Sequence, residues 1–500
     1  MLLGFDIGSS SVKAALVNEA NGQCLDATFF PKTEQLISSP EPGFAEQAPE
    51  MWYDNLKLAA RELLSRHPEA AAAVKAIGIS YQMHGLVCLD AAGEPLREAI
   101  IWCDSRAVRY GEKAADTLGH EWCLEHLLNL PGNFTAAKLA WVKDHQPEIY
   151  DRTTTAFLPG DYIAYRLTGQ RTTTISGLSE GMMWDHKEQR IAHELFEAME
   201  LDESKLATCV PTFAVQGYVS PEAAAEIGVP AGIPVSYRAG DQPNNALSLG
   251  VLNPGEVAAT GGTSGVVYAV SADPVFDMKS RVNPFVHVNG NVGVLLCINA
   301  VGILNAWLRR NIASDLSYEQ INELAATAPA GSDGLTIIPF GNGAERVLEN
   351  KESACAILGL QLNRHTRAHI LRAAHEGIAF AFAYGMEIMN RMGISTTTIR
   401  AGYGNLFLSP IFRETLAAIT GARILLLDTD GAQGAARGAG IGIGLYARPD
   451  DAFASLACRL TIEPNPNAAL QAAYERWKAS LTANNPPLLW GEGSSRASLR

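Results

Sequence analysis

The hydrophobic pattern of the first thirty residues predicts three short strands joined by tight turns. Apolar runs cover residues 2–6, 12–17 and 24–30, and they are separated by the small polar segments 8–11 (Gly-Ser-Ser-Ser) and 21–22 (Asn-Gly). Small polar residues between apolar runs indicate turns, and Asn-Gly is a strong hairpin signal. The chain therefore opens on strands that fold back on one another.

Helices and buried strands alternate after this opening. Residues 51–66 carry apolar side chains at helical spacing, and the apolar run 76–80 predicts a short strand. Residues 367–391 predict a long helix that is apolar on nearly every side, with Gly393 ending it. This alternation is typical of α/β layer folds, whose sites form at strand ends.

The opening pattern recurs about half a chain later. Residues 6–12 align with residues 260–266, and both segments place a Gly-Ser/Thr-Ser turn between apolar strands. Long-period self-similarity suggests two related domains that face each other, although two unrelated Gly-Ser turns would give the same pattern. The segment 250–255 is rich in Gly and Pro. We therefore expect an N-terminal domain over 1–246 and a C-terminal domain over 247–500.

Composition and charge exclude several classes of protein. The chain has 500 residues, of which 47% are hydrophobic, which suits two globular domains. Its net charge of −14 repels phosphate backbones and anionic lipids, so we expect no nucleic-acid or membrane partner. The eight cysteines show no zinc or disulfide spacing, and the first residues do not form a signal peptide. A reduced, cytoplasmic protein is expected.

The two predicted hairpin turns can wrap phosphate oxygens with backbone N–H groups and hydroxyls. The candidate residues are Ser9, Ser10, Lys13, Gly262, Thr263 and Ser264. Asp6 ends the strand before the first turn, where a carboxylate can hold Mg²⁺ through water or simply cap the turn. Each turn alone is a weak signal, because most Gly-Ser turns have no ligand.

A second acidic residue stands between a predicted strand and a predicted helix. Residues 233–240 form an apolar strand that ends in glycine, Asp241 follows, and Pro243 suits the first position of a helix. Asp241 would then face a crevice, where a carboxylate can take the proton of an attacking alcohol. The alternative, a helix cap, is about equally compatible with the local sequence.

Polar and aromatic residues follow two strands of the first half. Met83 and His84 come after the strand 76–80, and Trp102 and Asp104 follow another short apolar run. Sugar hydroxyls need paired donors and acceptors, and the C–H faces of a sugar need an apolar wall. The cluster therefore indicates a sugar site, although a single histidine is more often structural.

A glycine turn near residue 400 is a candidate nucleotide contact. Gly402, Gly404 and Asn405 lie between a predicted strand and a predicted helix, where a nucleotide can approach the backbone closely. The third glycine of a dinucleotide fingerprint is missing, so a Rossmann site is not expected. The later glycine run 438–444 indicates a tightly packed helix with a structural role.

As an ordered set, these features resemble the FGGY carbohydrate kinases over residues 2–445. The motifs that carry the likeness are Asp6-Ile7-Gly8-Ser9-Ser10, Trp102-x-Asp104-x-Arg106, Leu158-Pro159-Gly160-Asp161-Tyr162, Ala239-Gly240-Asp241-Gln242, Gly262-Thr263-Ser264-Gly265 and Glu345-Arg346. The resemblance implies two ribonuclease-H-like domains, as in actin and hexokinase, around a central cleft. It also implies ATP with Mg²⁺ and a small-molecule sugar as partners, and it leaves a homodimer open.

Within that family, the segments 43–47, 82–85 and 133–139 are similar to those of xylulokinases. The likeness implies phosphorylation of a primary hydroxyl of a ketose, D-xylulose, to give D-xylulose 5-phosphate. It makes Asp241 the base, puts the phosphates on the two hairpin turns and puts adenosine near residues 402–405. The residues it implies as sugar contacts are Met83, His84, Trp102, Asp104 and Gln242.

Three departures from the xylulokinase pattern keep other functions open. Gln242 replaces the usual Asn, as in glycerol kinases; residues 402–405 are not the usual Gly-Gly-Gly turn; and Val347-Leu348 replaces Thr-Pro. The alternatives are a kinase for ribulose, another ketose or polyol, or glycerol, and a non-catalytic protein that binds ATP and sugar. Met83-His84 argues against glycerol kinase, which has an Arg-Glu pair there.

Overall fold

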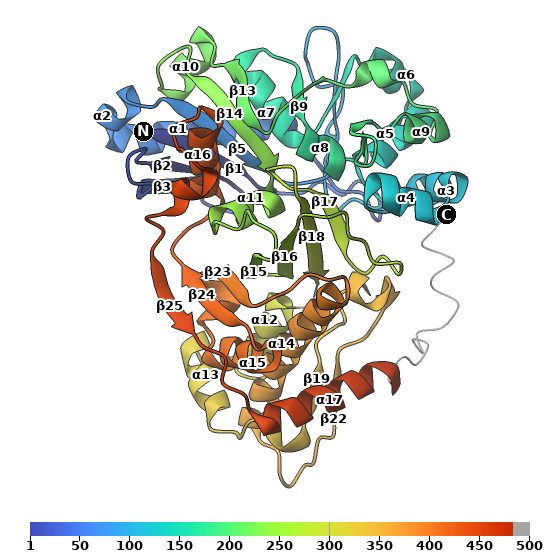
Figure 1. Cartoon of the computed structure of the whole chain (residues 1–500), viewed down its shortest axis with the longest axis vertical. Helices are drawn as coiled ribbons and strands as arrows, with labels where there is room; N and C mark the ends of the chain where they lie inside the picture. Colours follow the sequence, from blue (N-terminus) through green and yellow to red (C-terminus); the bar gives the residue numbers. More distant parts are fainter. Residues whose placement is uncertain (300, 484–500) are drawn as a thin grey trace.

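The computed structural model describes residues 1–299 and 301–483, and two large mixed sheets dominate it (Figure 1). The first sheet has the strand order β13-β14-β5-β1-β2-β3. Its strands are β1 (Leu2–Ile7), β2 (Val12–Val17), β3 (Cys24–Phe30), β5 (Ala76–Tyr81), β13 (Phe213–Tyr218) and β14 (Pro234–Gly240). β1 pairs antiparallel with β2 across the first hairpin and parallel with β5 on its other side.

The second sheet repeats this plan in the order β17-β18-β16-β15-β23-β24-β25. Its strands are β15 (Val257–Gly261), β16 (Gly265–Ser271), β17 (Asn283–Val286), β18 (Val292–Ile298), β23 (Thr398–Gly402), β24 (Arg423–Leu427) and β25 (Cys458–Ile462). β15 pairs antiparallel with β16 and parallel with β23, as β1 does with β2 and β5. The predicted α/β fold with two related domains is confirmed.

Helices pack against both sheets, and the two that apolar periodicity predicted, over residues 51–66 and 367–391, are among them. In the first half they include α1 (Pro49–Arg66), α3 (Val108–Leu118), α4 (His120–Leu127), α5 (Thr135–His145), α7 (Pro159–Thr168), α8 (Ile175–Glu180), α10 (Pro221–Ile227) and α11 (Asp241–Ser248). In the second half they include α12 (Gly302–Asn311), α13 (Tyr318–Ala326), α14 (Arg367–Arg391), α15 (Pro410–Thr420), α16 (Gly431–Gly442) and α17 (Ala468–Ala483). None of the helices in the described part of the chain is long and apolar enough to cross a bilayer.

Helix α16 belongs to the second half of the sequence but packs against β1, β5 and β14 of the first sheet (Figure 1). Glycines in the sheet make this contact possible. A Cβ at Gly4 would lie 1.9 Å from the carbonyl oxygen of Ala432, and one at Gly78 would lie 1.9 Å from that of Ala435. On the helix side, a Cβ at Gly442 would lie 1.8 Å from a backbone oxygen of β14. The glycine run therefore has the predicted structural role.

Helix α11 makes the reverse connection, because it belongs to the first half and contacts β15 and β16 of the second sheet. It also packs on α16. Helix α11 thus contacts strands of both sheets, and α16 lies on the first sheet beside it. The loop 249–256, which includes the predicted boundary segment, joins α11 to β15.

The start of α11 differs from the expectation. The helix begins at Asp241 rather than at Pro243, with Gly240 as its N-cap and no side-chain cap. Pro243 is tolerated at the third position because the first-turn N–H groups have no partner inside the helix. Asp241 therefore lies inside the first turn and does not serve as the helix cap.

Packing of α16 on the sheet can be tested with Gly78→Ala. The added methyl group would clash with helix backbone, so we expect the free energy of unfolding to fall by about 3 kcal/mol. A Cβ at Gly404 meets no atom within 4 Å, so Gly404→Ala is the control and should change stability by less than about 0.5 kcal/mol. Urea unfolding followed by tryptophan fluorescence measures both, and equal stability of the two variants would contradict the packing argument.

Candidate functional site

A cavity of about 310 Å³ lies where the strand ends of the two sheets meet. Its lining comes from both halves of the chain: Asp6, Gly8, Lys13, Asp241, Asn245, Ser248, Leu249, Thr260, Gly402, Thr429, Asp430 and Gly431. The cavity therefore contains both acids that the sequence singled out, the edges of both hairpins and the first turn of α16. We call it the interdomain cavity.

Asp6 is fixed at the floor of the interdomain cavity by its neighbours on the sheet. Ser80 Oγ donates a hydrogen bond of 2.8 Å to Asp6 Oδ1, and Lys13 Nζ lies 3.8 Å from Asp6 Oδ2. A Cβ at Gly431 would lie 2.7 Å from Asp6 Oδ2. The carboxylate thus sits against the N-terminus of α16, where the helix dipole favours negative charge.

Asp241 faces the same cavity from the first turn of α11 and is partly buried. Burial, and then the negative charge of Asp6, raise the pKa of Asp241 to about 7. A carboxyl group with a pKa near neutrality can take a proton and release it under physiological conditions. Its position at a strand-to-helix turn, as the sequence predicted, makes it a candidate general base.

A second cavity, of about 440 Å³, lies in the C-terminal domain beside the second hairpin. Its lining residues include Gly261, Gly262, Thr263, Gly302, Asn305, Tyr318, Asn322, His375, Asn405, Leu406 and Ser409. The end of β15 borders both cavities, with Thr260 in one and Gly261 in the other. The turn after β23 likewise contributes Gly402 to the first cavity and Asn405 to the second, so one chain segment spans the two spaces.

His84 lies directly after β5 in a left-handed conformation, with φ of 63°. Its Nδ1 donates a hydrogen bond of 2.9 Å to the Glu180 carbonyl, which leaves Nε2 as an acceptor. Burial, and then the charge of Lys138, lower the pKa of His84 to about 3, so the ring is neutral near pH 7. Met83 beside it is buried. The neutral His84 ring offers a hydrogen-bond acceptor, and Met83 offers apolar surface, of the kind that a polyol needs.

Trp102 lies over the first hairpin with half of its surface exposed. Its Nε1 is 3.4 Å from Ser9 Oγ. Ser10 Oγ in the same turn donates a hydrogen bond to Glu34. The predicted phosphate turn and the predicted sugar wall are therefore neighbours.

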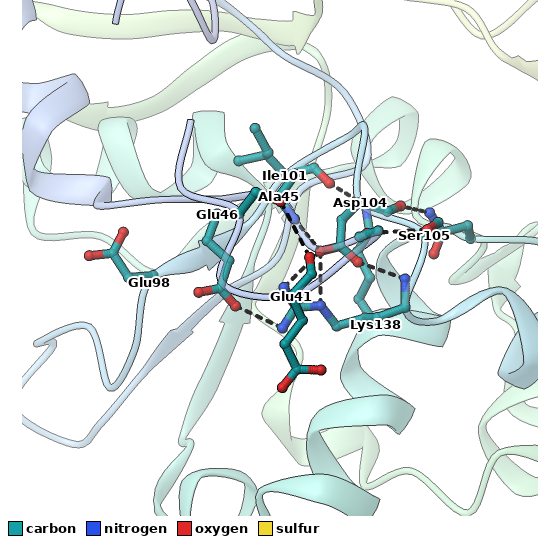
Figure 2. Close-up of polar contacts among 12 residues, drawn as sticks. Glu41, Ala45, Glu46, Glu98, Ile101, Asp104, Ser105 and Lys138 are labelled. Atoms are coloured by element: carbon teal, nitrogen blue, oxygen red, sulfur yellow. Dashed lines mark hydrogen bonds and ion pairs between the residues drawn. The ribbon is translucent and has the colours of Figure 1, made fainter. Parts of the chain in front are cut away.

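Asp104 lines neither of the two cavities, and its predicted contact with a sugar stays a prediction. Its side chain is 1% exposed and accepts a 2.7 Å hydrogen bond from the Ala45 N–H. Arg106 Nε donates to it at 2.8 Å, and Arg106 also pairs with Glu46 (Figure 2). Both oxygens are occupied within the protein, so the Asp and Arg of the Trp-x-Asp-x-Arg motif form a buried ion pair, whereas Trp102 is half exposed.

Lys138 connects this network to His84. Its Nζ donates hydrogen bonds to the carbonyl oxygens of His84 at 2.7 Å and Ile101 at 3.0 Å. Figure 2 shows Lys138 and Ile101. Burial lowers the pKa of Lys138 to about 7. One buried amine therefore ties together the two strand ends that carry His84 and Trp102.

The C-terminal domain closes over His84 through β17, a contact that the sequence did not indicate. The Phe285 ring centroid lies 5.4 Å from that of His84, and the ring of Phe134 packs against both. The Val286 N–H donates a hydrogen bond of 2.9 Å to Ser179 Oγ on α8. The space beside His84 thus depends on how the two domains meet.

The remaining predicted residues differ in their exposure to solvent. Gln242 and Ser264 are partly buried, Thr263 and Asn405 are exposed, and Gly404 is partly exposed in the turn after β23. The residues missed by sequence reasoning that line or adjoin the site are Glu180, Asn245, Thr260, Phe285, Thr429 and Asp430. Of these, Asp430 had a usable signal, because an Asp before a small-residue helix is a good N-cap; its side chain accepts a hydrogen bond from Gln433 N–H.

The interdomain cavity offers carboxylate oxygens for a magnesium ion whose remaining ligands would be phosphate and water. No group of three or more His, Cys, Asp or Glu among the described residues is arranged to hold a metal. Three carboxylates line the interdomain cavity, those of Asp6, Asp241 and Asp430, against one lysine. Mg²⁺ prefers such oxygen ligands and usually takes one or two carboxylates together with phosphates and water, so the donor set fits a phosphate-bound ion.

Comparison with known proteins identifies the family. The chain is 29% identical to the xylulose kinase of Haemophilus influenzae over 86% of this chain and 88% of that protein. It is also 29% identical to the xylulose kinase of Escherichia coli, over 95% of this chain and 96% of that protein. The crystal structure of xylulose kinase from Rhodospirillum rubrum superposes with a TM-score of 0.87 at 28% identity, covering 96% of this chain and 97% of that one.

The family models divide the chain in the same way as its two sheets. The N-terminal domain model of the FGGY family of carbohydrate kinases matches residues 1–248, and the C-terminal domain model matches residues 257–444. The two matches together cover most of the chain, and the loop between α11 and β15 separates them. The chain belongs to the FGGY family of carbohydrate kinases.

Proposed function

We propose that this protein transfers the γ-phosphoryl group of ATP to a primary hydroxyl of D-xylulose, with Asp241 as the general base. The observation that carries the proposal is the raised pKa of Asp241 in a cavity bordered by both hairpins. The similarity to xylulose kinases over nearly the whole chain supports the choice of sugar.

The ATP phosphates fit the interdomain cavity by its chemistry. The Gly8 N–H already donates to the Ser11 carbonyl, so the donors would come from the rest of the two hairpin turns and from the N-terminus of α16, which also supplies a positive dipole end. Lys13 supplies the nearby cation. Mg²⁺ bound to the phosphates would be held by Asp6, through water, and would neutralise charge on the transferring group. The adenosine would occupy the second cavity, between Gly262 and Asn405.

The sugar would lie on the N-terminal side, between Asp241, His84 and Trp102. Neutral His84 accepts a hydrogen bond from a hydroxyl at Nε2, because Nδ1 already donates to the Glu180 carbonyl. Met83 and the exposed face of Trp102 supply apolar surface. Gln242, directly after the base in α11, can donate to and accept from hydroxyl groups.

In the reaction, Asp241 accepts the proton of the primary hydroxyl as the oxygen attacks the γ-phosphorus in line. A new O–P bond forms to the sugar, the bond between the γ-phosphorus and the β,γ-bridging oxygen breaks, and ADP leaves with those electrons. Hairpin N–H groups and Lys13 stabilise the negative charge on the transferring group. Closure of β17 over His84 excludes water, which would otherwise accept the phosphoryl group.

The sugar is tested with a panel of D-xylulose, D-ribulose and glycerol in a coupled assay of ADP release. We expect the highest kcat/KM with D-xylulose. Turnover of another polyol with none of D-xylulose would refute the sugar assignment, and Gln242 is the residue that keeps this alternative open. ATP hydrolysis that no sugar changes would instead indicate a binding protein on the same scaffold.

The base is tested with Asp241→Asn, which keeps the size of the side chain but removes the proton acceptor. We expect kcat to fall by about 10² to 10⁴-fold while ATP binding and thermal unfolding stay close to wild type. Asp451→Asn is the control, because Asp451 is an exposed acid in the 3-10 helix Pro449–Phe453 and an Asn there keeps the acceptor for the Arg448 N–H. Wild-type turnover by a folded Asp241→Asn protein would mean that another group takes the proton.

The pH dependence follows from the raised pKa of Asp241. Since the base must be ionised, kcat/KM for the sugar should decline as the pH falls through about 7 and level off above it. Asp6→Asn removes the like charge, so its acidic limb should move to lower pH even though this variant is slower. The pH profiles of kcat/KM for the wild type and for Asp6→Asn, recorded at constant ionic strength, measure these effects. A wild-type decline centred near the usual carboxyl pKa would be inconsistent with the proposed base.

A further inference from the structure

Glu180 is a buried carboxyl group between the two parts of the sugar-binding region, and the reaction above does not use it. It ends α8 and is 1% exposed. Its Oε1 accepts a hydrogen bond of 3.4 Å from the His84 N–H, and its backbone carbonyl accepts one of 2.9 Å from His84 Nδ1. Both the backbone and the ring of His84 are therefore held by one residue.

These contacts matter because His84 has a strained backbone. A non-glycine residue with φ of 63° carries a conformational cost that the surrounding contacts must offset. The His84 N–H and Nδ1 are bonded to Glu180, and its carbonyl accepts from Lys138 Nζ at 2.7 Å. Glu180 thus supplies two of these three hydrogen bonds, one through its carboxyl group and one through its backbone carbonyl.

Glu180 also adjoins the strand end that carries the base. A Cβ at Gly240 would lie 2.2 Å from Glu180 Oε2 and 2.5 Å from Met83 Cγ. Glycine at this position therefore lets the carboxyl group lie against the backbone of β14, one residue before Asp241. The neighbouring Ser179 accepts the hydrogen bond from Val286 of the C-terminal domain. The end of α8 is a junction between the His84 turn, the Asp241 strand end and β17.

We propose that Glu180 is a positioning residue, which fixes the His84 turn relative to Asp241 and thereby sets the affinity for the sugar. This inference rests on the proposed sugar-kinase function and deepens it. Glu180 acts through His84 and the strand end of β14 and does not itself take part in proton transfer.

The charge state that suits this role is the neutral acid. Burial raises the pKa of Glu180 well above its usual range, and the nearby charges of Asp241 and Asp161 raise it further, whereas the His84 N–H acts in the opposite direction. The ionisable groups around it are Tyr81, His84, Lys138, Asp161, Asp241 and Tyr268. A second ionised carboxylate beside Asp241 would repel the charge of the base, and a neutral acid avoids this.

The experiment compares Glu180→Gln, Glu180→Ala and the matched control Glu376→Gln in the full-length protein. Gln is the close isostere of a neutral acid and keeps the acceptor for the His84 N–H, so Glu180→Gln should retain kcat/KM within about threefold. Glu180→Ala should raise KM for D-xylulose about tenfold or more and leave KM for ATP unchanged, because the turn relaxes. Glu376 is similarly buried, but its carboxylate contacts Gly331, Ser332 and Arg372 rather than the His84 turn, so its variant should keep the wild-type KM for D-xylulose.

Two further readouts separate positioning from general packing. The acidic limb of the kcat/KM profile should stay in place in Glu180→Gln, because a neutral residue replaces a neutral acid. The infrared carbonyl band of a protonated carboxyl group should disappear in the same variant. If the acidic limb of the kcat/KM profile moves to lower pH in Glu180→Gln, Glu180 is ionised in the wild type. An unchanged KM for D-xylulose in a folded Glu180→Ala protein would overturn the positioning role.

Failure of this inference can be told from failure of the proposed function. If wild-type protein phosphorylates no sugar in the panel, the proposed function fails. If the wild type is active and the Glu180 variants match it in sugar KM, only the present inference fails. Thermal unfolding of each variant, with Glu376→Gln as reference, shows whether a loss of activity reflects a loss of fold.

Discussion

Close contact between α16 and the first sheet is the packing constraint on which the site depends. Gly4 and Gly78 let the helix backbone approach the strands to a distance that any side chain would prevent. Since α16 is in the second half of the sequence, this contact joins the second half of the chain to the first sheet. It also brings the first turn of α16, with Asp430 and Gly431, against Asp6 at the floor of the interdomain cavity.

A second constraint is the set of buried polar residues around the His84 turn. Asp104, Arg106 and Glu46 form an ion-pair network under Trp102, and Lys138 links that region to the His84 carbonyl. Buried charges are costly unless they are paired and hydrogen-bonded. The network is therefore sensitive to changes that leave one partner behind, and it holds a strained residue where a neutral imidazole can meet a hydroxyl.

Sequence reasoning singled out Asp6 and Asp241, which the structure brings into one cavity, but it did not give the geometry around them. Asp6, Asp241 and the hairpins were recognisable because each stands at a strand end, and strand ends of α/β sheets converge. For Asp104, the motif showed the residue type but did not show that Ala45 and Arg106 hold its carboxylate. Glu180 and Phe285 gave no local signal, since neither stands in a recognisable turn and their importance arises from residues about a hundred or more positions away.

The sequence by itself determined the α/β class, the internal repeat, the acidic surface and the residues able to bind phosphate or accept a proton. These follow from local periodicity and from the chemistry of short motifs. The tertiary structure alone decided that α11 and α16 pack across the two halves and that Asp104 is enclosed. It also decided that burial, and then the charge of Asp6, raise the pKa of Asp241 to about 7. Burial and electrostatic coupling depend on distances between residues remote in the chain, which no local pattern specifies.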